Sequence, residues 1–192
     1  MLSGTPRTQQ DRSRTTRAAL ISTARRLFAE RGYAAVSAGD VVTATGLTRG
    51  ALHHHFGDKA GLFRAVFERV EAELGAELEV AVGAGGVAAG VGAFLDICQR
   101  PEVVRIALTD APVVLGWQTW RAIEAEHGLG LIVGVIEQAM ADGAELPRPP
   151  ELLAQLVLSV LIEAALLIAS GTPRESVEPA LLTMLAGLFG AR

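Results

Sequence analysis

The segment from Ser37 to Lys59, SAGDVVTATGLTRGALHHHFGDK, constrains the fold of this chain more than any other segment. Ser37 and Asp40 have the spacing of a capping box, which marks the first turn of a helix. Gly46 can adopt the left-handed conformation that ends a helix in a tight turn. Thr48 can cap the helix that follows. The segment therefore predicts two short helices joined by a tight turn, the pattern of a helix-turn-helix.

The rest of the sequence favours an all-α fold. Half of the 192 residues are apolar, and no stretch alternates for long between apolar and polar residues, as a half-buried strand would. Apolar residues recur instead at helical spacing: Leu20, Ala24 and Leu27 mark one face of a first helix, predicted over residues 11–31. The chain is long enough for one domain or two small ones, with a sizeable core.

The chain divides into three predicted parts, which are a disordered polar tail over residues 1–10, a three-helix domain with the helix-turn-helix over 11–58, and a second helical domain over 76–192. A long fourth helix should join the two domains. It begins at Asp58, contributes to the first domain up to about residue 75, and ends before the run Gly83–Gly86, which is the clearest break in the sequence.

Apolar spacing predicts the further helices of the second domain. Their expected positions are 87–99, a helix that opens at Pro101, 117–140, 152–170 and 174–189. The tripeptide Asp110–Pro112 should break or kink the helix that opens at Pro101. The glycines near His127–Gly130 should make the helix over 117–140 irregular.

Charge is distributed unevenly along the chain. Residues 1–59 hold nine basic and four acidic side chains, whereas the remaining residues hold eight basic and 17 acidic ones. A basic N-terminal part that coincides with a helix-turn-helix pattern indicates contact with nucleic acid at that end of the chain.

The sequence offers little for catalysis, metal binding or disulfide formation. Cys98 is the only cysteine, so a single chain can form neither a disulfide nor a cysteine-based metal cluster. We find no nucleophile–base pair, no GxxxxGK phosphate loop and no HExxH motif. Side chains of the consecutive histidines 53–55 diverge by about 100° on a helix, which is unfavourable for chelating one ion. We therefore expect no enzyme, no cofactor and no metal.

The longest apolar run, residues 152–169, is long enough to suggest a membrane span. Gln155, Ser159 and Glu163, however, draw a polar stripe along one side of it. The N-terminus also lacks the apolar segment of a signal peptide. We therefore expect a soluble helix, no membrane association and a cytoplasmic protein.

An arginine-bearing first helix, the helix-turn-helix, the run GALHHHFGDKAGLF and a long linking helix together resemble the TetR family of bacterial transcriptional repressors. The family signature G-x-L-Y-x-H-F-x-x-K-x-x-L falls on Gly50, Leu52, His53, His55, Phe56, Lys59 and Leu62. His53 stands where the family usually has Tyr. The N-terminal resemblance covers about residues 12–75. The remainder looks like the family's C-terminal ligand-binding and dimerisation domain.

The resemblance implies an all-α homodimer that binds a palindromic operator in double-stranded DNA and is released by a small-molecule effector. Two alternatives stay open: a ligand-dependent activator on the same fold, and an enzyme or small-molecule-binding helical protein with no role on DNA. The last two helices are too apolar to face water, and two from each subunit would make a four-helix bundle. We expect them to form the dimer interface.

DNA-binding proteins draw affinity mostly from phosphate contacts and specificity from contacts to base edges. The residues expected to contact DNA are Thr43, Thr48, Arg49, Gly50, Ala51, His53, His54, Lys59 and Arg17. Arg49 is the best candidate for a bidentate contact to guanine. Gly50 and Ala51 are small enough for close approach to the groove. His53 and Lys59 should bind phosphate, Lys59 with help from the free N–H groups of a helix start.

A ligand pocket needs an apolar wall and a few polar groups. The candidate lining residues are Phe94, Cys98, Arg105, Trp117, Trp120, His127, Leu131 and Glu163. Apolar residues of this kind are more often plain core than pocket lining, so that alternative stays open for each apolar member. Glu163 is the most suggestive polar member, because it sits in mid-helix among leucines and would need a partner if it were buried.

Overall fold

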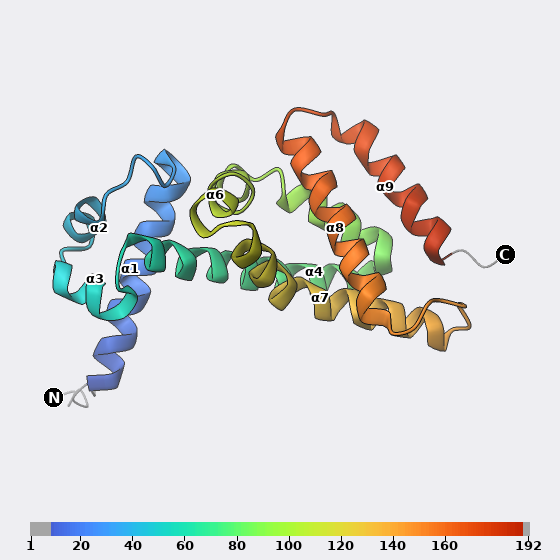
Figure 1. Ribbon diagram of the computed structural model, residues 1–192, viewed down its shortest axis with the longest axis horizontal. Coiled ribbons are helices and arrows are strands. Elements are labelled where there is room, and N and C mark those ends of the chain that lie inside the picture. Colours follow the sequence, from blue (N-terminus) through green and yellow to red (C-terminus); the bar gives the residue numbers. More distant parts are fainter. Residues whose placement is uncertain (1–8, 190–192) are drawn as a thin grey trace, which may run out of the picture. The chain divides into compact units, whose positions relative to one another are not determined.

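The computed structural model describes residues 9–189, and every regular element in this range is a helix (Figure 1). The all-α prediction is therefore confirmed. In chain order the helices are α1 (Gln9–Arg31), α2 (Ala38–Thr45), α3 (Arg49–Phe56), α4 (Lys59–Ile97), α5 (Pro101–Val103), the π-helix η1 (Val104–Asp110), α6 (Ala111–Leu115), α7 (Trp117–Ala141), α8 (Pro150–Ala169) and α9 (Arg174–Phe189).

The chain forms two compact units, one up to Phe67 and one from Glu68 onward, so α4 contributes to both. Most of the predicted tail over residues 1–10 lies outside the described residues. Its last two residues, Gln9 and Gln10, are helical and open α1, which therefore begins two residues before the predicted start.

Local hydrogen bonds build the helix-turn-helix of the first unit as its sequence predicts. The Ser37 side chain accepts a hydrogen bond from the backbone N–H of Asp40 (3.1 Å), and the Asp40 carboxylate accepts one from the N–H of Ser37 (2.8 Å). This capping box starts α2. Gly46 ends α2 with φ 67°, the left-handed conformation that the turn needs. The Thr48 hydroxyl then accepts from the N–H of Ala51 and caps α3.

Lys59 ties the start of α4 to the turn between α1 and α2. Its ammonium group donates to the carbonyl oxygens of Tyr33 (3.0 Å) and Val36 (2.9 Å). It also lies 3.8 Å from the centre of the Tyr33 ring, a cation–π contact. The rings of Phe28, Tyr33 and Phe63 contact one another with centroid separations of 5.0–5.7 Å. Lys59 thus covers an aromatic core while it satisfies two carbonyl groups of the turn.

Gly61 brings the first turn of α4 against the end of α3. A Cβ atom at this position would overlap the carbonyl oxygen of Phe56. The Asp58 side chain accepts a hydrogen bond from the N–H of Gly61 (2.8 Å) and so caps the same turn. This close approach fixes where α4 leaves the helix-turn-helix.

In the second unit α4 kinks at Gly85 and Gly86. Both have non-helical dihedral angles, and Gly86 has φ 70° and ψ −159°, a conformation open almost only to glycine. The kink lies inside the predicted break at Gly83–Gly86. The part after the kink packs by Val91 and Leu95 into a core shared with α7, α8 and α9.

One expectation for this unit is wrong in part and another is wrong. Asp110–Pro112 does not break the helical path, because Asp110 and Ala111 keep right-handed helical angles and Pro112 lies in the first turn of α6, where proline needs no N–H. The helix type does change here, from the π-helix η1 to the α-helix α6. The chain turns instead at Gly116, with φ 78°. The helix through His127–Gly130 is continuous within α7.

α8 and α9 lie side by side as an antiparallel pair, and α8 also packs along α7 (Figure 1). Arg174 anchors the start of α9, because it pairs with Asp96 of α4 and with Glu178 (2.8 Å).

By length and composition alone, α4 and α8 would be able to cross a membrane, as core helices of water-soluble proteins also can. Gln155, Ser159 and Glu163 all lie on the exposed side of α8.

Two glycine-to-alanine substitutions, one at a crowded and one at an open position, test the packing at the start of α4. Gly61→Ala should lower the free energy of unfolding by roughly 1–3 kcal/mol, because the added methyl group collides with main chain that cannot rotate away. Gly50→Ala, in the open first turn of α3, should raise it by up to about 1 kcal/mol, because alanine favours a helix. Urea denaturation followed by circular dichroism measures both. Equal effects of the two substitutions would contradict the close approach.

Candidate functional site

The helices α2 and α3 present a polar face that is separate from their buried side. Val41 and Leu52 are buried in the core of the first unit. The exposed members of the predicted DNA-contact set on these helices and the turn between them are Thr43, Thr48, Arg49, Gly50, His53 and His54, while Ala51 is half-buried. The structure therefore leaves these side chains accessible to a partner outside the unit.

Several of these groups are held by local contacts. The guanidinium group of Arg49 reaches back over α2 to Gly39, where an added Cβ atom would lie 3.5 Å from it. Gly50 has open space around it. Nδ1 of His53 makes a short hydrogen bond with the carbonyl oxygen of Gly57, so Nε2 is the ring nitrogen left for another partner.

Arg17 extends from α1 to the end of α3. Its guanidinium carbon lies 5.4 Å from the centre of the Phe56 ring. It also raises the positive potential near His55. The pKa of His55 is lowered mainly by burial and, to a smaller extent, by the electrostatic effects of His54 and Arg17. Arg17 thus adds a positive charge beside the exposed face of α3, as expected for a residue that contacts phosphate.

Lys59 has a structural role that the sequence does not predict. The sequence predicts a phosphate contact, but the ammonium group is half-buried and spends two of its three donors on the carbonyl groups of Tyr33 and Val36. At the same helix start, the N–H group of Gly61 donates to Asp58. Lys59 is a structural clamp, because it joins the start of α4 to the turn after α1, where the carbonyl group of Tyr33 also accepts from the N–H of Val36 (3.3 Å).

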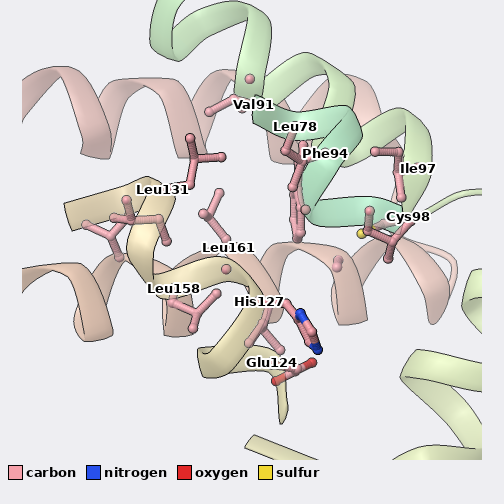
Figure 2. Close-up of a pocket in the computed structure, with 18 of the residues that line it drawn as sticks. Leu78, Val91, Phe94, Ile97, Cys98, Glu124, His127, Leu131, Leu158 and Leu161 are labelled. Atoms are coloured by element: carbon pink, nitrogen blue, oxygen red, sulfur yellow. The ribbon is translucent and has the colours of Figure 1, made fainter. Parts of the chain in front are cut away.

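The second unit contains a cavity of about 140 Å³ (Figure 2). Its walls come from α4, α7 and α8, with further residues from α5, η1 and α9. Side chains such as Leu78, Val91, Phe94, Leu131 and Leu161 make most of the surface hydrocarbon. A second, more open hollow of about 1060 Å³ shares several of these lining residues, so the cavity lies next to a wide groove along α4 and α7.

Half of the predicted pocket residues line this cavity: Phe94, Cys98, His127 and Leu131. The other half, Arg105, Trp117, Trp120 and Glu163, do not. Arg105 and Glu163 point to solvent, because each lies on the outer face of its helix. Trp120 is fully buried as core, and Trp117 is 63% exposed and makes an edge-to-face contact with it, at 4.9 Å between ring centres. The aromatic pair therefore packs outside the cavity.

The sequence reasoning missed two acidic residues that line the cavity, Glu71 and Glu124. Burial, together with the nearby Glu124, raises the pKa of Glu71 to about 8. Burial raises the pKa of Glu124 to about 7, against the opposing effect of Arg121 at 3.2 Å. Burial also raises the pKa of the Cys98 thiol to about 12. Glu71 interrupts the apolar face of the fourth helix, and that interruption is the sequence signal for it.

The arrangement suits a small hydrophobic ligand and offers no metal site. Among residues 9–189, no group of three or more histidine, cysteine and acidic side chains comes close enough to hold a metal ion. For comparison, an apolar cavity of about 150 Å³ in another protein binds benzene.

The raised pKa of Glu71 gives stability a pH dependence with a definite sign. Between about pH 4.5, its ordinary value, and about pH 8, the folded protein keeps a proton that the unfolded chain has lost. The free energy of unfolding should therefore fall as pH rises through this window, by roughly 1.4 kcal/mol for each unit of pKa shift. Glu71→Gln should make the slope shallower and leave the part that Glu124 contributes, because the pKa of Glu124 is also raised, to about 7. Urea denaturation at a series of pH values measures the slope.

The exposed Glu126, on α7, provides the matched control for this measurement. Glu126→Gln also removes one carboxylate but should leave the slope as in the wild type. A slope as steep in Glu71→Gln as in the wild type would show that this carboxyl group does not contribute to it.

Both units match known protein families. Residues 20–66 match the family described as bacterial regulatory proteins, tetR family, and residues 84–191 match the tetracyclin repressor-like C-terminal domain. A crystal structure of a TetR-family transcriptional regulator from Pectobacterium atrosepticum is similar to this chain, with 36% identity and a TM-score of 0.82. That alignment covers 96% of this chain and 99% of the other.

Two named regulators are also similar. The HTH-type transcriptional regulator AcrR of Shigella flexneri is 42% identical over 65 residues, which are 34% of this chain and 30% of AcrR. The HTH-type transcriptional repressor Rv1474c of Mycobacterium tuberculosis is 33% identical over 116 residues, 58% of this chain and 62% of the repressor. The aligned part is thus less than two thirds of either regulator.

The two family matches fall on the two units of the structure, and the C-terminal match alone spans more than half of the sequence. Together with the full-length similarity to the Pectobacterium structure, they show that the chain belongs to the TetR family of bacterial transcriptional regulators.

Proposed function

We propose that this protein is a cytoplasmic transcriptional repressor that binds a palindromic operator as a homodimer and leaves it when a small molecule fills the cavity. The observation that carries the proposal is the exposed face of α3. The helix is capped at its start by Thr48, anchored by the buried Leu52, and presents Arg49 and Gly50 outward. A short, rigid helix with such a face fits the major groove of DNA.

The exposed side chains suggest a division of roles on DNA. Arg49 can make a bidentate contact to guanine, and Gly50, with open space around it, lets the helix approach the groove floor. Thr43, His54 and Nε2 of His53 can reach phosphates at the edges of the groove. Arg17 adds a phosphate contact from α1, while Lys59 supports the unit from inside.

The outer faces of α8 and α9 support a homodimer. Leucine and methionine side chains on these faces are 39–63% exposed: Leu152, Leu156, Leu167, Met184 and Leu188. An exposed apolar surface of this kind along two adjacent helices marks an interaction site. Packing the pair against its copy by twofold symmetry would bury it in a four-helix bundle.

The continuity of α4 supports a route for release. The helix begins beside the helix-turn-helix at Lys59 and supplies the cavity wall from Glu71 to Cys98, just past its end. A ligand that favours a different arrangement of this helix would change the spacing of the two DNA-reading units. Reciprocity then requires that operator DNA weaken ligand binding by the same factor.

Arg49→Ala should weaken binding to the operator by roughly 1–3 kcal/mol, because it removes a bidentate contact to a base. The measurement is a gel-shift titration on the DNA that flanks the coding region, with unrelated DNA as competitor. Arg26→Ala removes the same charge from the exposed side of α1, where Arg26 pairs with Glu30, and should keep specific binding. The operator proposal fails if the wild type gives no specific, salt-sensitive shift and Arg49→Ala behaves in the same way.

Leu156→Arg should convert the homodimer into monomers, because it places a charge in the middle of the proposed α8–α9 interface. Sedimentation equilibrium measures the mass in solution. Val113→Arg makes the same change at an 84% exposed site on α6, outside the interface, and should leave the dimer intact. A wild type that is monomeric at micromolar concentration would exclude this interface.

A further inference from the structure

Glu71 is a carboxyl group with no partner in a cavity of hydrocarbon side chains. It lines the cavity from α4, and no residue in the described part of the chain donates a hydrogen bond or an ion pair to it. Glu124, the other acidic lining residue, is paired with Arg121, which also donates to Ser159 (2.9 Å). Glu71 is therefore the acidic group that the protein itself leaves unsatisfied.

Glu71 is half-buried. An unpaired carboxylate in such a cavity is costly, because it loses part of its hydration without gaining a counter-charge. The protein meets this cost by holding the proton, as the raised pKa of Glu71 indicates. A ligand that carried a positive charge would supply the missing counter-charge. Such a group would make a charge-assisted hydrogen bond with the carboxylate, the stronger kind of hydrogen bond.

The other lining residues favour a cationic ligand over an anionic or an uncharged one. The cavity walls contain no lysine or arginine side chain, and His127 is the sole basic residue among the described lining residues. An anion would find no lysine or arginine counter-charge in the cavity wall and would keep Glu71 in its protonated form. A pure hydrocarbon would leave Glu71 unpaired. A cation satisfies the acidic side of the cavity and exposes no new unpaired group.

The size and shape of the cavity limit the hydrocarbon part of the ligand. Its volume of about 140 Å³ suits one aromatic ring with a short chain. Figure 2 shows Glu124 and His127 together at one end of the cavity and hydrocarbon side chains, including Val91 and Leu131, at the other. The ligand should therefore be charged at one end only.

We propose that the effector is a small hydrophobic amine, bound as its ammonium ion to the carboxylate of Glu71, with its hydrocarbon part among Phe94, Leu131 and Leu161. This inference rests on the proposed function, because it names the chemical class of the effector for the same cavity. Glu124 adds negative potential but remains paired with Arg121. Because Glu71 holds a proton at pH 7 without ligand, binding of an ammonium ion should release up to one proton.

Three molecules of similar size separate the charge classes: 2-phenylethylamine (a cation), 2-phenylethanol (neutral) and phenylacetate (an anion). Isothermal titration of the full chain at pH 7, in buffers of different ionisation enthalpy, measures affinity and proton release together. The amine should bind about 10- to 100-fold more tightly than the alcohol, as expected for a hydrogen bond to a charged group. Phenylacetate should bind most weakly.

Glu71→Gln should remove that advantage of the amine and abolish its proton release, while the affinity for 2-phenylethanol stays unchanged. Glu126→Gln, with the same loss of charge outside the cavity, should bind the amine like the wild type. The proposal is overturned if the alcohol or phenylacetate binds as tightly as the amine, or if Glu71→Gln keeps the preference. Proton release by the wild type provides a readout that does not depend on the variant folding.

Operator titrations without and with 2-phenylethylamine keep the two proposals apart. Specific operator binding that the amine lowers in wild type but not in Glu71→Gln supports both. Specific operator binding with no amine binding in the calorimeter overturns the effector class alone. Amine binding without any specific operator binding overturns the repressor function and leaves the amine site standing.

Discussion

The first unit depends on the contacts of the Lys59 ammonium group, which are two hydrogen bonds and a cation–π contact. It joins the start of α4 to the carbonyl groups of Tyr33 and Val36, in the turn after α1. The ammonium group also covers the aromatic rings of the core. In the sequence, α3 lies between that turn and α4, so these contacts hold the segments on both sides of α3. A lysine in a DNA-binding motif can thus have a structural role: here its ammonium group donates to two carbonyl groups of the same unit and helps to position the helix that carries Arg49.

Local rules account for the parts of the fold that the sequence predicts well. The capping box of Ser37 and Asp40 and the left-handed Gly46 involve residues at most a few positions apart, so their spacing already contains the geometry. The Lys59 contacts span 23 and 26 residues, and nothing in the spacing reveals which carbonyl groups will lie nearby. Sequence thus places Lys59 at a helix start correctly but does not reveal its contacts with these two carbonyl groups.

The residues that line the cavity were harder to predict, because they depend on which face of each helix is turned toward the cavity. Glu163 and Glu71 both interrupt apolar helical segments, yet Glu163 shares the exposed stripe of α8 with Gln155 and Ser159, whereas Glu71 faces the cavity. Trp120 illustrates the same limit, since its fully buried ring fills the core beside Ile123 rather than the cavity wall. Composition identifies an apolar unit but does not reveal which of its polar residues turn inward.

Glu71 places a group that is costly to ionise both in the cavity wall and on α4. It lies four residues beyond Phe67, the last residue of the first unit, on the helix that both units share. A carboxyl group that is costly to ionise makes the cavity sensitive to the charge of a ligand, because a counter-charge relieves that cost. A ligand shifts a conformational equilibrium only by its difference in affinity for the two states. In the proposed mechanism, an ammonium ion that bound one arrangement of α4 more tightly than another would therefore act on the helix that also begins beside the helix-turn-helix.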